Sequence, residues 1–170
     1  GGAGSYTVEA LARCGVGSLT LVDHEAITVT DINRQLYALQ PTIGHKKVQI
    51  AKERVHNIDE DILVHTYETY YNEDTMGLFD LKAYDYIVDA MDTVSSKILL
   101  IEQAQKYQVP VISCLDMGNK LNPSSLEIMD ISRVAADPAV KKMRAELRRK
   151  GVRRLKVLCS REHSRRGFEF

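Results

Sequence analysis

Short apolar runs alternate with stretches of helical periodicity along most of this 170-residue chain. Strands separated by helices of about 10–15 residues are typical of βαβ units, in which helices pack on a parallel sheet. We therefore expect an α/β fold with a mostly parallel sheet. The runs predicted to be strands are 19–22, 62–67, 84–88, 109–113, 126–131 and 155–159. The stretches predicted to be helices are one that ends near Gly15 and those at 32–39, 46–57, 96–107 and 139–150.

A glycine-rich turn opens the first of these helices. The chain begins Gly-Gly-Ala-Gly-Ser, and the strand predicted after the helix ends at Asp23. Such a turn lets backbone N–H groups approach phosphate closely, and an acidic residue at the end of the next strand can hold ribose hydroxyls. This pattern predicts a Rossmann-like nucleotide site with Gly2, Gly4 and Ser5 at the phosphates and Asp23 at the ribose. The alternative is a turn that only allows the helix to pack tightly on the strand.

In folds of this kind a buried strand precedes the glycine turn, and this sequence has no residue before Gly1. Without that central strand, two neighbouring strands would lose their hydrogen-bonding partner. We therefore expect a longer protein, in which the first strand of the sheet is missing from the chain given.

Charged residues gather in three further places. Arg34 belongs to the run Asp-Ile-Asn-Arg-Gln, and Lys47 belongs to the run Gly-His-Lys-Lys-Val. Cations beside a phosphate site stabilise the charge of a phosphoryl group during transfer. The run Asp-Ala-Met-Asp at 89–92 ends a predicted strand, where a carboxylate is well placed to hold Mg²⁺. Each run alone has an ordinary structural explanation, but together they favour adenylating chemistry.

Charge is divided unevenly along the chain. Residues 1–130 contain 10 Lys/Arg and 19 Asp/Glu, whereas residues 131–170 contain 13 and 4. A basic end indicates an anionic partner, with a solvated basic helix as the alternative. We expect an ATP-binding domain at 1–131, a basic helix-and-strand appendage at 132–162 and a divergent tail at 163–170.

The sequence resembles the ThiF/MoeB/HesA superfamily of adenylating enzymes, which are related to ubiquitin-activating enzymes, through the ordered segments GGAGS, LTLVD, DINRQL, GHKKV and VDAMD. Within that superfamily it is more similar to the tRNA threonylcarbamoyladenosine dehydratases, through VEALARCGVGSLTLVD, DTVSSK, PVISCLDMGNKLNP and the basic stretch that follows. The resemblance extends to about residue 162.

The resemblance implies ATP and Mg²⁺ as cofactors and catalytic roles for Arg34, Lys47 and Asp92. Asp92 would also hold the metal ion. Further contacts with the nucleotide are implied for Asn33, Gln35 and Asp89. The family more often has asparagine where Asp31 stands, and a carboxylate there would repel ATP.

The implied reaction is ATP-dependent dehydration of threonylcarbamoyladenosine in tRNA. Its threonyl carboxylate would form an acyl-adenylate, and a nucleophile of the same modification would then close a ring and release AMP. The implied partners are tRNA, a second copy of the chain in a homodimer, and a cysteine desulfurase or sulfur acceptor. The cations expected to contact the tRNA backbone are Lys141, Lys142, Arg148, Arg149 and Arg153.

Two other functions stay open at this point. A ThiF- or MoeB-like adenylyltransferase activates the C-terminus of a ubiquitin-like sulfur carrier and usually has paired CxxC motifs for zinc. Cys14, Cys114 and Cys159 form no such pair, so we expect no zinc site in this chain. An NAD-dependent oxidoreductase, or a nucleotide-binding module without chemistry, would explain the glycines and Asp23 but would leave Arg34, Lys47 and Asp92 without a role.

The cellular setting is predicted from what the sequence lacks. No apolar run reaches the roughly 18 residues of a membrane helix, and no leader opens the chain. An odd number of cysteines suits a reducing compartment. The sequence therefore predicts a cytoplasmic protein without a membrane segment, in which Cys159 is the cysteine to test for reactivity.

Overall fold

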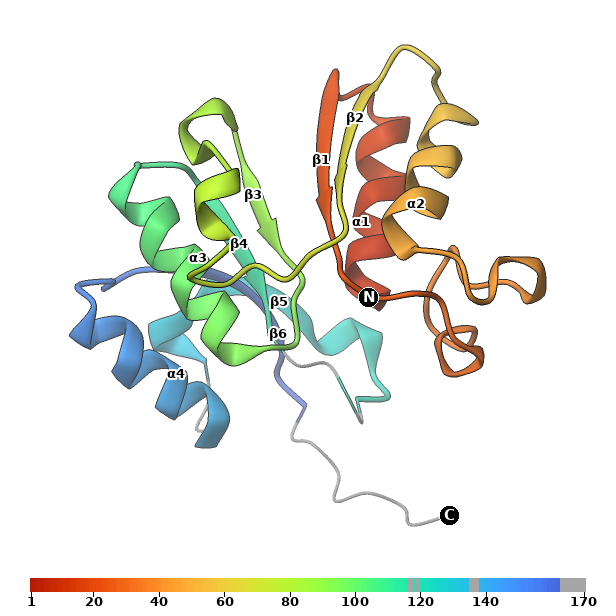
Figure 1. Ribbon diagram of the computed structural model, residues 1–170. Helices are drawn as coiled ribbons and strands as arrows, with labels where there is room; N and C mark the ends of the chain where they lie inside the picture. Colours follow the sequence, from red (N-terminus) through yellow and green to blue (C-terminus); the bar gives the residue numbers. More distant parts are fainter. Residues whose placement is uncertain (116–117, 119, 135–137, 163–170) are drawn as a thin grey trace. The chain divides into compact units, whose positions relative to one another are not determined.

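The computed structural model describes residues 1–115, 118, 120–134 and 138–162. The chain divides into two compact units, Gly1–Met76 and Gly77–Phe170, each with a hydrophobic core of its own (Figure 1). No helix among the described residues is long and apolar enough to cross a bilayer.

In the first unit, two helices lie side by side on one face of a pair of parallel strands. These elements are α1 (Gly2–Arg13), β1 (Ser18–Val22), α2 (Lys47–His56) and β2 (Leu63–Tyr67). Gly15 follows α1 with a φ of 77°, a left-handed conformation in which glycine ends a helix without strain. Arg54 on α2 donates two hydrogen bonds to Glu9 on α1, at 2.8 and 2.9 Å, and this pairing lowers the pKa of Glu9 to about 2.

The helix predicted at 32–39 is wrong. The structure has hydrogen-bonded turns there, because side chains take up backbone groups that a helix would need. The Leu36 N–H donates to Ser5 Oγ at 3.0 Å, and the Tyr37 hydroxyl donates to the Ser5 carbonyl at 2.8 Å. The Thr42 hydroxyl donates to the Tyr37 carbonyl at 2.7 Å. These bonds tie the segment to the start of α1.

The second unit is built on a four-stranded sheet in the order β3-β4-β6-β5. The first three of these strands are parallel, and β5 is antiparallel to β6. Helices α3 and α4 pack on one face of the sheet. The elements are β3 (Ile87–Asp89), α3 (Val94–Lys106), β4 (Val111–Cys114), β5 (Leu126–Asp130), α4 (Pro138–Arg149) and β6 (Lys156–Ser160). The predicted α/β fold with a mostly parallel sheet is thus confirmed.

The basic stretch at 132–162 is built into this second unit. Strand β6 lies between β4 and β5, and Met143 and Leu147 of α4 are buried in the core with Ile101 of α3. The domain boundaries placed after residues 131 and 162 stay predictions. The tail predicted at 163–170 lies outside the described residues.

Candidate nucleotide site

The glycine-rich start of the chain forms the first turn of α1. Gly2 and Gly4 are partly exposed there. The first intrahelical hydrogen bond runs from the Ser5 N–H to the Gly1 carbonyl at 3.0 Å. The N–H groups ahead of Ser5 therefore have no partner within the helix, and together with the helix dipole they favour an anion at this end.

Gly2 lies directly against Arg34. A Cβ at Gly2 would come 3.2 Å from the Arg34 carbonyl oxygen, which is tighter than ordinary contact, and 3.6 Å from the Arg34 Cγ. Glycine therefore allows the start of the helix to approach the segment that contains Arg34. The side chain of Arg34 is itself 54% exposed, so its guanidinium can reach a bound ligand.

Asp31 holds the predicted cations in place. Its buried carboxylate accepts hydrogen bonds from Arg34 Nη2 at 3.2 Å and Gln35 Nε2 at 2.8 Å, and it lies 3.6 Å from Lys47 Nζ. Burial works to raise the pKa of this carboxyl, but hydrogen bonds from Thr28 and the charges of Lys47 and Arg34 outweigh it, so the pKa is lowered. The carboxylate therefore stays ionised, and it fixes the positions of three neighbouring side chains.

Lys47 begins α2, and its side chain is only 7% exposed. Its ammonium donates to the Glu25 carboxylate and lies beside Asp31. Burial works to lower the pKa of this ammonium, but the carboxylates of Glu25, Asp23 and Asp31 outweigh burial and raise the pKa. Lys47 is therefore a fixed cation at the N-terminal end of α2.

Asp23 lies directly after β1, as predicted. Its Oδ2 is 3.5 Å from the backbone nitrogen of Gly1, and its Oδ1 accepts the Glu25 N–H at 2.9 Å. The carboxylate therefore stands beside the start of α1, where the sequence pattern places the ribose. The first unit thus brings together four of the predicted residues, Gly2, Asp23, Arg34 and Lys47.

Three other predicted nucleotide ligands are engaged within the fold. Ser5 is buried, and its hydroxyl bonds two backbone groups at 2.8 and 3.0 Å. Gln35 is buried, and its amide is bonded to Asp31. Asn33 is exposed and accepts from Arg34 Nη1 at 3.3 Å. The Ser5 hydroxyl and the Gln35 amide nitrogen therefore shape the site from inside, and the contacts with the nucleotide predicted for these two residues stay predictions.

Asp89 is fully buried at the end of β3. Lys97 Nζ donates to its two oxygens at 2.9 and 3.1 Å and to the Cys114 carbonyl at 2.8 Å. Ser113 Oγ donates to the same carboxylate at 2.5 Å, and the Met91 N–H donates at 3.1 Å. Both oxygens thus have hydrogen-bond partners, and the contact with the nucleotide predicted for Asp89 stays a prediction. Its role is to join the ends of β3 and β4 to α3.

Asp92, by contrast, is exposed, and among the described residues no hydrogen bond or ion pair engages its carboxylate. The described part of the chain contains no group of three His, Cys, Asp or Glu residues that could hold a metal ion. Mg²⁺ usually takes one or two protein carboxylates and fills its shell with water and substrate phosphates. A single free carboxylate therefore fits a magnesium ion that arrives with a nucleotide.

Helix α4 presents a basic face to solvent. Arg144 donates to two backbone carbonyls at 3.4 and 3.2 Å, and Lys150 pairs with Glu102 at 2.6 Å, so both serve the fold. The cations predicted to contact tRNA are all exposed: Lys141, Lys142, Arg148, Arg149 and Arg153.

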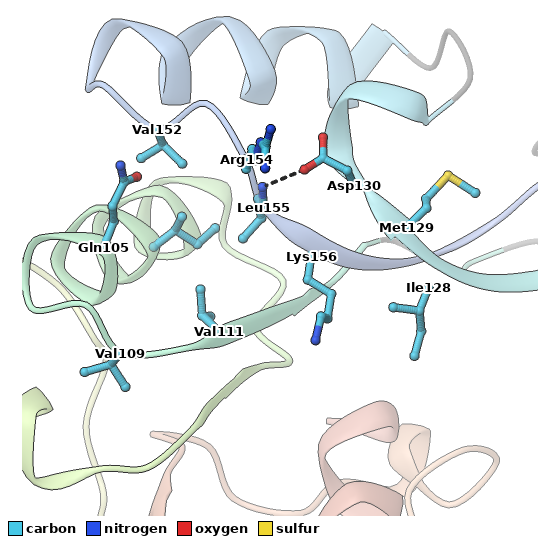
Figure 2. Close-up of a pocket in the computed structure, with 11 residues that line it drawn as sticks. Gln105, Val109, Val111, Ile128, Met129, Asp130, Val152, Arg154, Leu155 and Lys156 are labelled. Carbon is cyan, nitrogen blue, oxygen red and sulfur yellow. Dashed lines mark hydrogen bonds between the residues drawn. The ribbon is translucent and has the colours of Figure 1, made fainter.

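An open hollow of about 510 Å³ lies in the second unit, beside the stretch that leads into β6 (Figure 2). Its walls are largely apolar, and three of its polar side chains, Gln105, Asp130 and Lys156, have hydrogen-bond partners. Asp130 accepts the Leu155 N–H at 3.3 Å, and Lys156 Nζ lies 3.5 Å from the Tyr86 hydroxyl. The hollow shares no residue with the predicted nucleotide site, and we assign it no ligand.

Cys159 does not have the features of a reactive cysteine. It is 4% exposed in β6, and burial raises the pKa of its thiol. Because the thiolate is the reactive form of cysteine, the structure argues against the reactivity considered for this residue.

Sequence reasoning missed Glu25, Lys97 and Ser113. A lysine at 97 falls on the apolar face of a predicted helix, and a serine at 113 interrupts an apolar strand. Buried polar residues of this kind are paired in native structures, so each was a signal of a hidden partner. Glu25 gave no such signal, because its pairing with Lys47 depends on the turn after β1.

Comparison with known proteins places this arrangement in a family. The tRNA threonylcarbamoyladenosine dehydratase of Bacillus subtilis is 40% identical over 154 residues, which cover 91% of this chain and 61% of that protein. The enzyme of the same name from Haemophilus influenzae is 38% identical, over 88% of this chain and 57% of that protein. The chain thus spans about three fifths of the length of these curated relatives.

A solved structure shares the fold. The Escherichia coli tRNA N6-threonylcarbamoyladenosine dehydratase TcdA, in complex with ATP, superposes with a TM-score of 0.88 at 28% identity, over 95% of this chain and 70% of that one. The sequence profile of the ThiF family matches residues 1–120. Since that match covers most of the chain, the protein belongs to the ThiF family.

Proposed function

We propose that this chain binds ATP and adenylates the threonyl carboxylate of threonylcarbamoyladenosine in tRNA, as part of a tRNA threonylcarbamoyladenosine dehydratase. The observation that carries the proposal is the cluster around Asp31, which holds Arg34 and Lys47 with Gly2 and the first turn of α1 beside them. Two cations next to a helix N-terminus suit a polyphosphate. The names of the relatives and the ATP in the TcdA structure support the choice of substrates.

In the proposed reaction, a carboxylate oxygen attacks the α-phosphate, and the bond to pyrophosphate breaks to leave an acyl-adenylate. A nucleophile of the same modification then attacks the acyl carbon, loses its proton, closes a ring and releases AMP. The oxygen of the water formally lost leaves with AMP. Arg34 and Lys47 would stabilise the charge that builds on the phosphate. Asp23 would hold the ribose, and the N–H groups near Gly2 and Gly4 would face the phosphates.

On the family resemblance alone, we also propose that Asp92 holds Mg²⁺, which when bound supplies positive charge. The homodimer and a cysteine desulfurase or sulfur-acceptor partner are also proposals, and they rest on the family resemblance alone.

The activity is tested by incubating the protein with ATP and tRNA, digesting the tRNA and weighing its nucleosides. We expect threonylcarbamoyladenosine to lose one water while AMP and pyrophosphate form in equal amounts. An ATP analogue with a methylene bridge between the α- and β-phosphates is the control and should leave the nucleoside unchanged. Unaltered tRNA, together with adenylation of a ubiquitin-like carrier, would instead support activation of a sulfur carrier.

We also propose that the exposed cations of α4 bind the tRNA backbone. The double substitution Arg148→Glu and Arg149→Glu should weaken tRNA binding. It should also reduce the slope of a plot of the logarithm of the binding constant against the logarithm of salt concentration. The slope should fall by about 1 for each tRNA phosphate that the protein no longer neutralises. Filter binding at several salt concentrations measures this slope. The matched control is Lys52→Glu with Lys106→Glu, which changes net charge equally on α2 and α3. Equal slopes in both double variants would show that the basic face serves solubility alone.

A further inference from the structure

Glu25 covers the ammonium of Lys47 in the first unit. The Lys47 side chain is only 7% exposed, and its Nζ donates a hydrogen bond to the Glu25 carboxylate. A buried ammonium needs an anionic partner, because burial removes the water that would otherwise solvate it. The Glu25 side chain, by contrast, is 53% exposed. The ion pair therefore joins a buried cation to a carboxylate that lies at the surface.

The other carboxylate beside Lys47 is held much more firmly. Asp31 Oδ2 accepts hydrogen bonds from the N–H and the hydroxyl of Thr28 at 3.0 and 3.1 Å, and Asp31 Oδ1 accepts from Arg34 and Gln35. The Asp31 side chain is only 6% exposed. Because four hydrogen bonds and burial keep this carboxylate in place, we expect it to stay beside Lys47 when a ligand arrives.

The Glu25 carboxylate is held by a single hydrogen bond. Within the part of the chain that the structure describes, only Lys47 donates to it, and His24 Nε2 lies 3.8 Å from Glu25 Oε1, beyond hydrogen-bonding distance. The hydrogen bond from Lys47 lowers the pKa of the Glu25 carboxyl, so the group is ionised while it is bound. The Glu25 backbone is anchored, since its N–H donates to Asp23 Oδ1 at 2.9 Å and its carbonyl accepts the Lys47 N–H at 3.1 Å. The side chain can therefore turn into solvent while the backbone stays in place.

We propose that the Glu25 carboxylate is a displaceable counter-ion of Lys47, which turns into solvent when a phosphate of ATP takes its place at the ammonium. This inference rests on the proposed function, in which Lys47 stabilises charge on the phosphate. It explains how a lysine that is 7% exposed can contact a ligand. Exchange of one anion for another keeps the buried ammonium paired in both states. The exchange also lowers the affinity for ATP, because ATP must compete with Glu25 for the lysine.

The test measures the Kd of ATP by isothermal titration calorimetry at a fixed Mg²⁺ concentration. Glu25→Gln keeps the size of the side chain and removes its charge, so we expect ATP to bind about 3- to 10-fold more tightly. In a protein that already carries Lys47→Ala, the same change should leave the Kd within about twofold, because no ammonium is left to be released. Glu68→Gln, at an exposed carboxylate just after β2, is the matched control for loss of one negative charge and should also leave the Kd within about twofold.

Each other outcome has a definite meaning. If Glu25→Gln binds ATP as tightly as the unchanged protein or more weakly, Glu25 does not compete with a phosphate, and the inference is overturned while the proposed function stands. Equal tightening by Glu25→Gln with and without Lys47 would mean that the carboxylate only repels ATP from a distance, which also overturns the inference. The same conclusion would follow if Glu68→Gln tightened ATP binding as much as Glu25→Gln. If the unchanged protein binds no ATP, the proposed function fails and this inference fails with it.

Discussion

Replacing Lys97 by methionine should lower the free energy of unfolding by about 3–5 kcal/mol, because it leaves a buried charge without its partner. Asp89 has an exposed fraction of 0% and Lys97 of 5%, so water cannot replace the lost ammonium. Methionine keeps most of the apolar stem, which limits the loss of packing. Urea unfolding followed by circular dichroism measures the change, as a lower midpoint with an unaltered slope.

Two further variants separate charge from packing. The double variant Asp89→Asn with Lys97→Met removes both charges and should recover much of the lost stability, since a buried pair costs most when only one partner is removed. Lys106→Met, at an exposed position of the same helix, should change stability by no more than about 0.5 kcal/mol. A Lys97→Met protein that unfolds at the unchanged urea concentration would mean that this ion pair does not hold β3 and α3 together.

The contrast between Asp89 and Asp92 shows that a sequence pattern can predict where a strand ends without predicting which of two carboxylates is buried. Both carboxylates follow the same apolar run, and that position correctly predicted the end of a strand. The pattern did not say which of them faces the interior. Asp89 is the last residue of β3 and is buried, because Lys97 and Ser113 offer it charge and a hydrogen bond. Those partners come from a helix and a strand that only the folded chain brings together.

Local periodicity was reliable where packing alone decides the structure. The spacing of Val48, Ala51 and Val55 predicted the buried face of α2, and the helix forms there. The same reasoning failed at 32–39, where Ser5 captures backbone groups from a distant part of the sequence. Hydrogen bonds between segments that are distant in the sequence do not affect the spacing of apolar residues, so that spacing cannot predict them.

Asp31 is the clearest case of a residue whose interpretation from the sequence differs from the role that its contacts in the structure indicate. From the sequence it was expected to repel ATP, because it is a carboxylate at a position where the family more often has asparagine. In the structure its charge is matched by the cations of Arg34 and Lys47. The carboxylate therefore fixes the positions of both cations, and of the two only Arg34 has an exposed side chain.

Replacing Lys47 by alanine should reduce ATP–pyrophosphate exchange about 100- to 1000-fold, the usual loss when one preorganised donor to a developing negative charge is removed. The fold should survive this change. Glu25 has a half-exposed side chain that water can solvate, and Asp31 keeps its bonds to Arg34, Gln35 and Thr28. Exchange is measured with labelled pyrophosphate in the presence of ATP and tRNA.

The matched control for this prediction is Lys52→Ala, on the same helix and without an ion pair among the described residues, and it should exchange pyrophosphate normally. The loss in Lys47→Ala should fall mainly on kcat, because the ammonium is asked to stabilise charge that appears only as the phosphate is attacked. A loss confined to the KM for ATP would mean that Lys47 binds the ground state and the transition state equally. Full exchange in Lys47→Ala would mean that the buried ammonium serves only to neutralise Glu25 and Asp31, and the positive charge for adenylation would then have to come from Arg34.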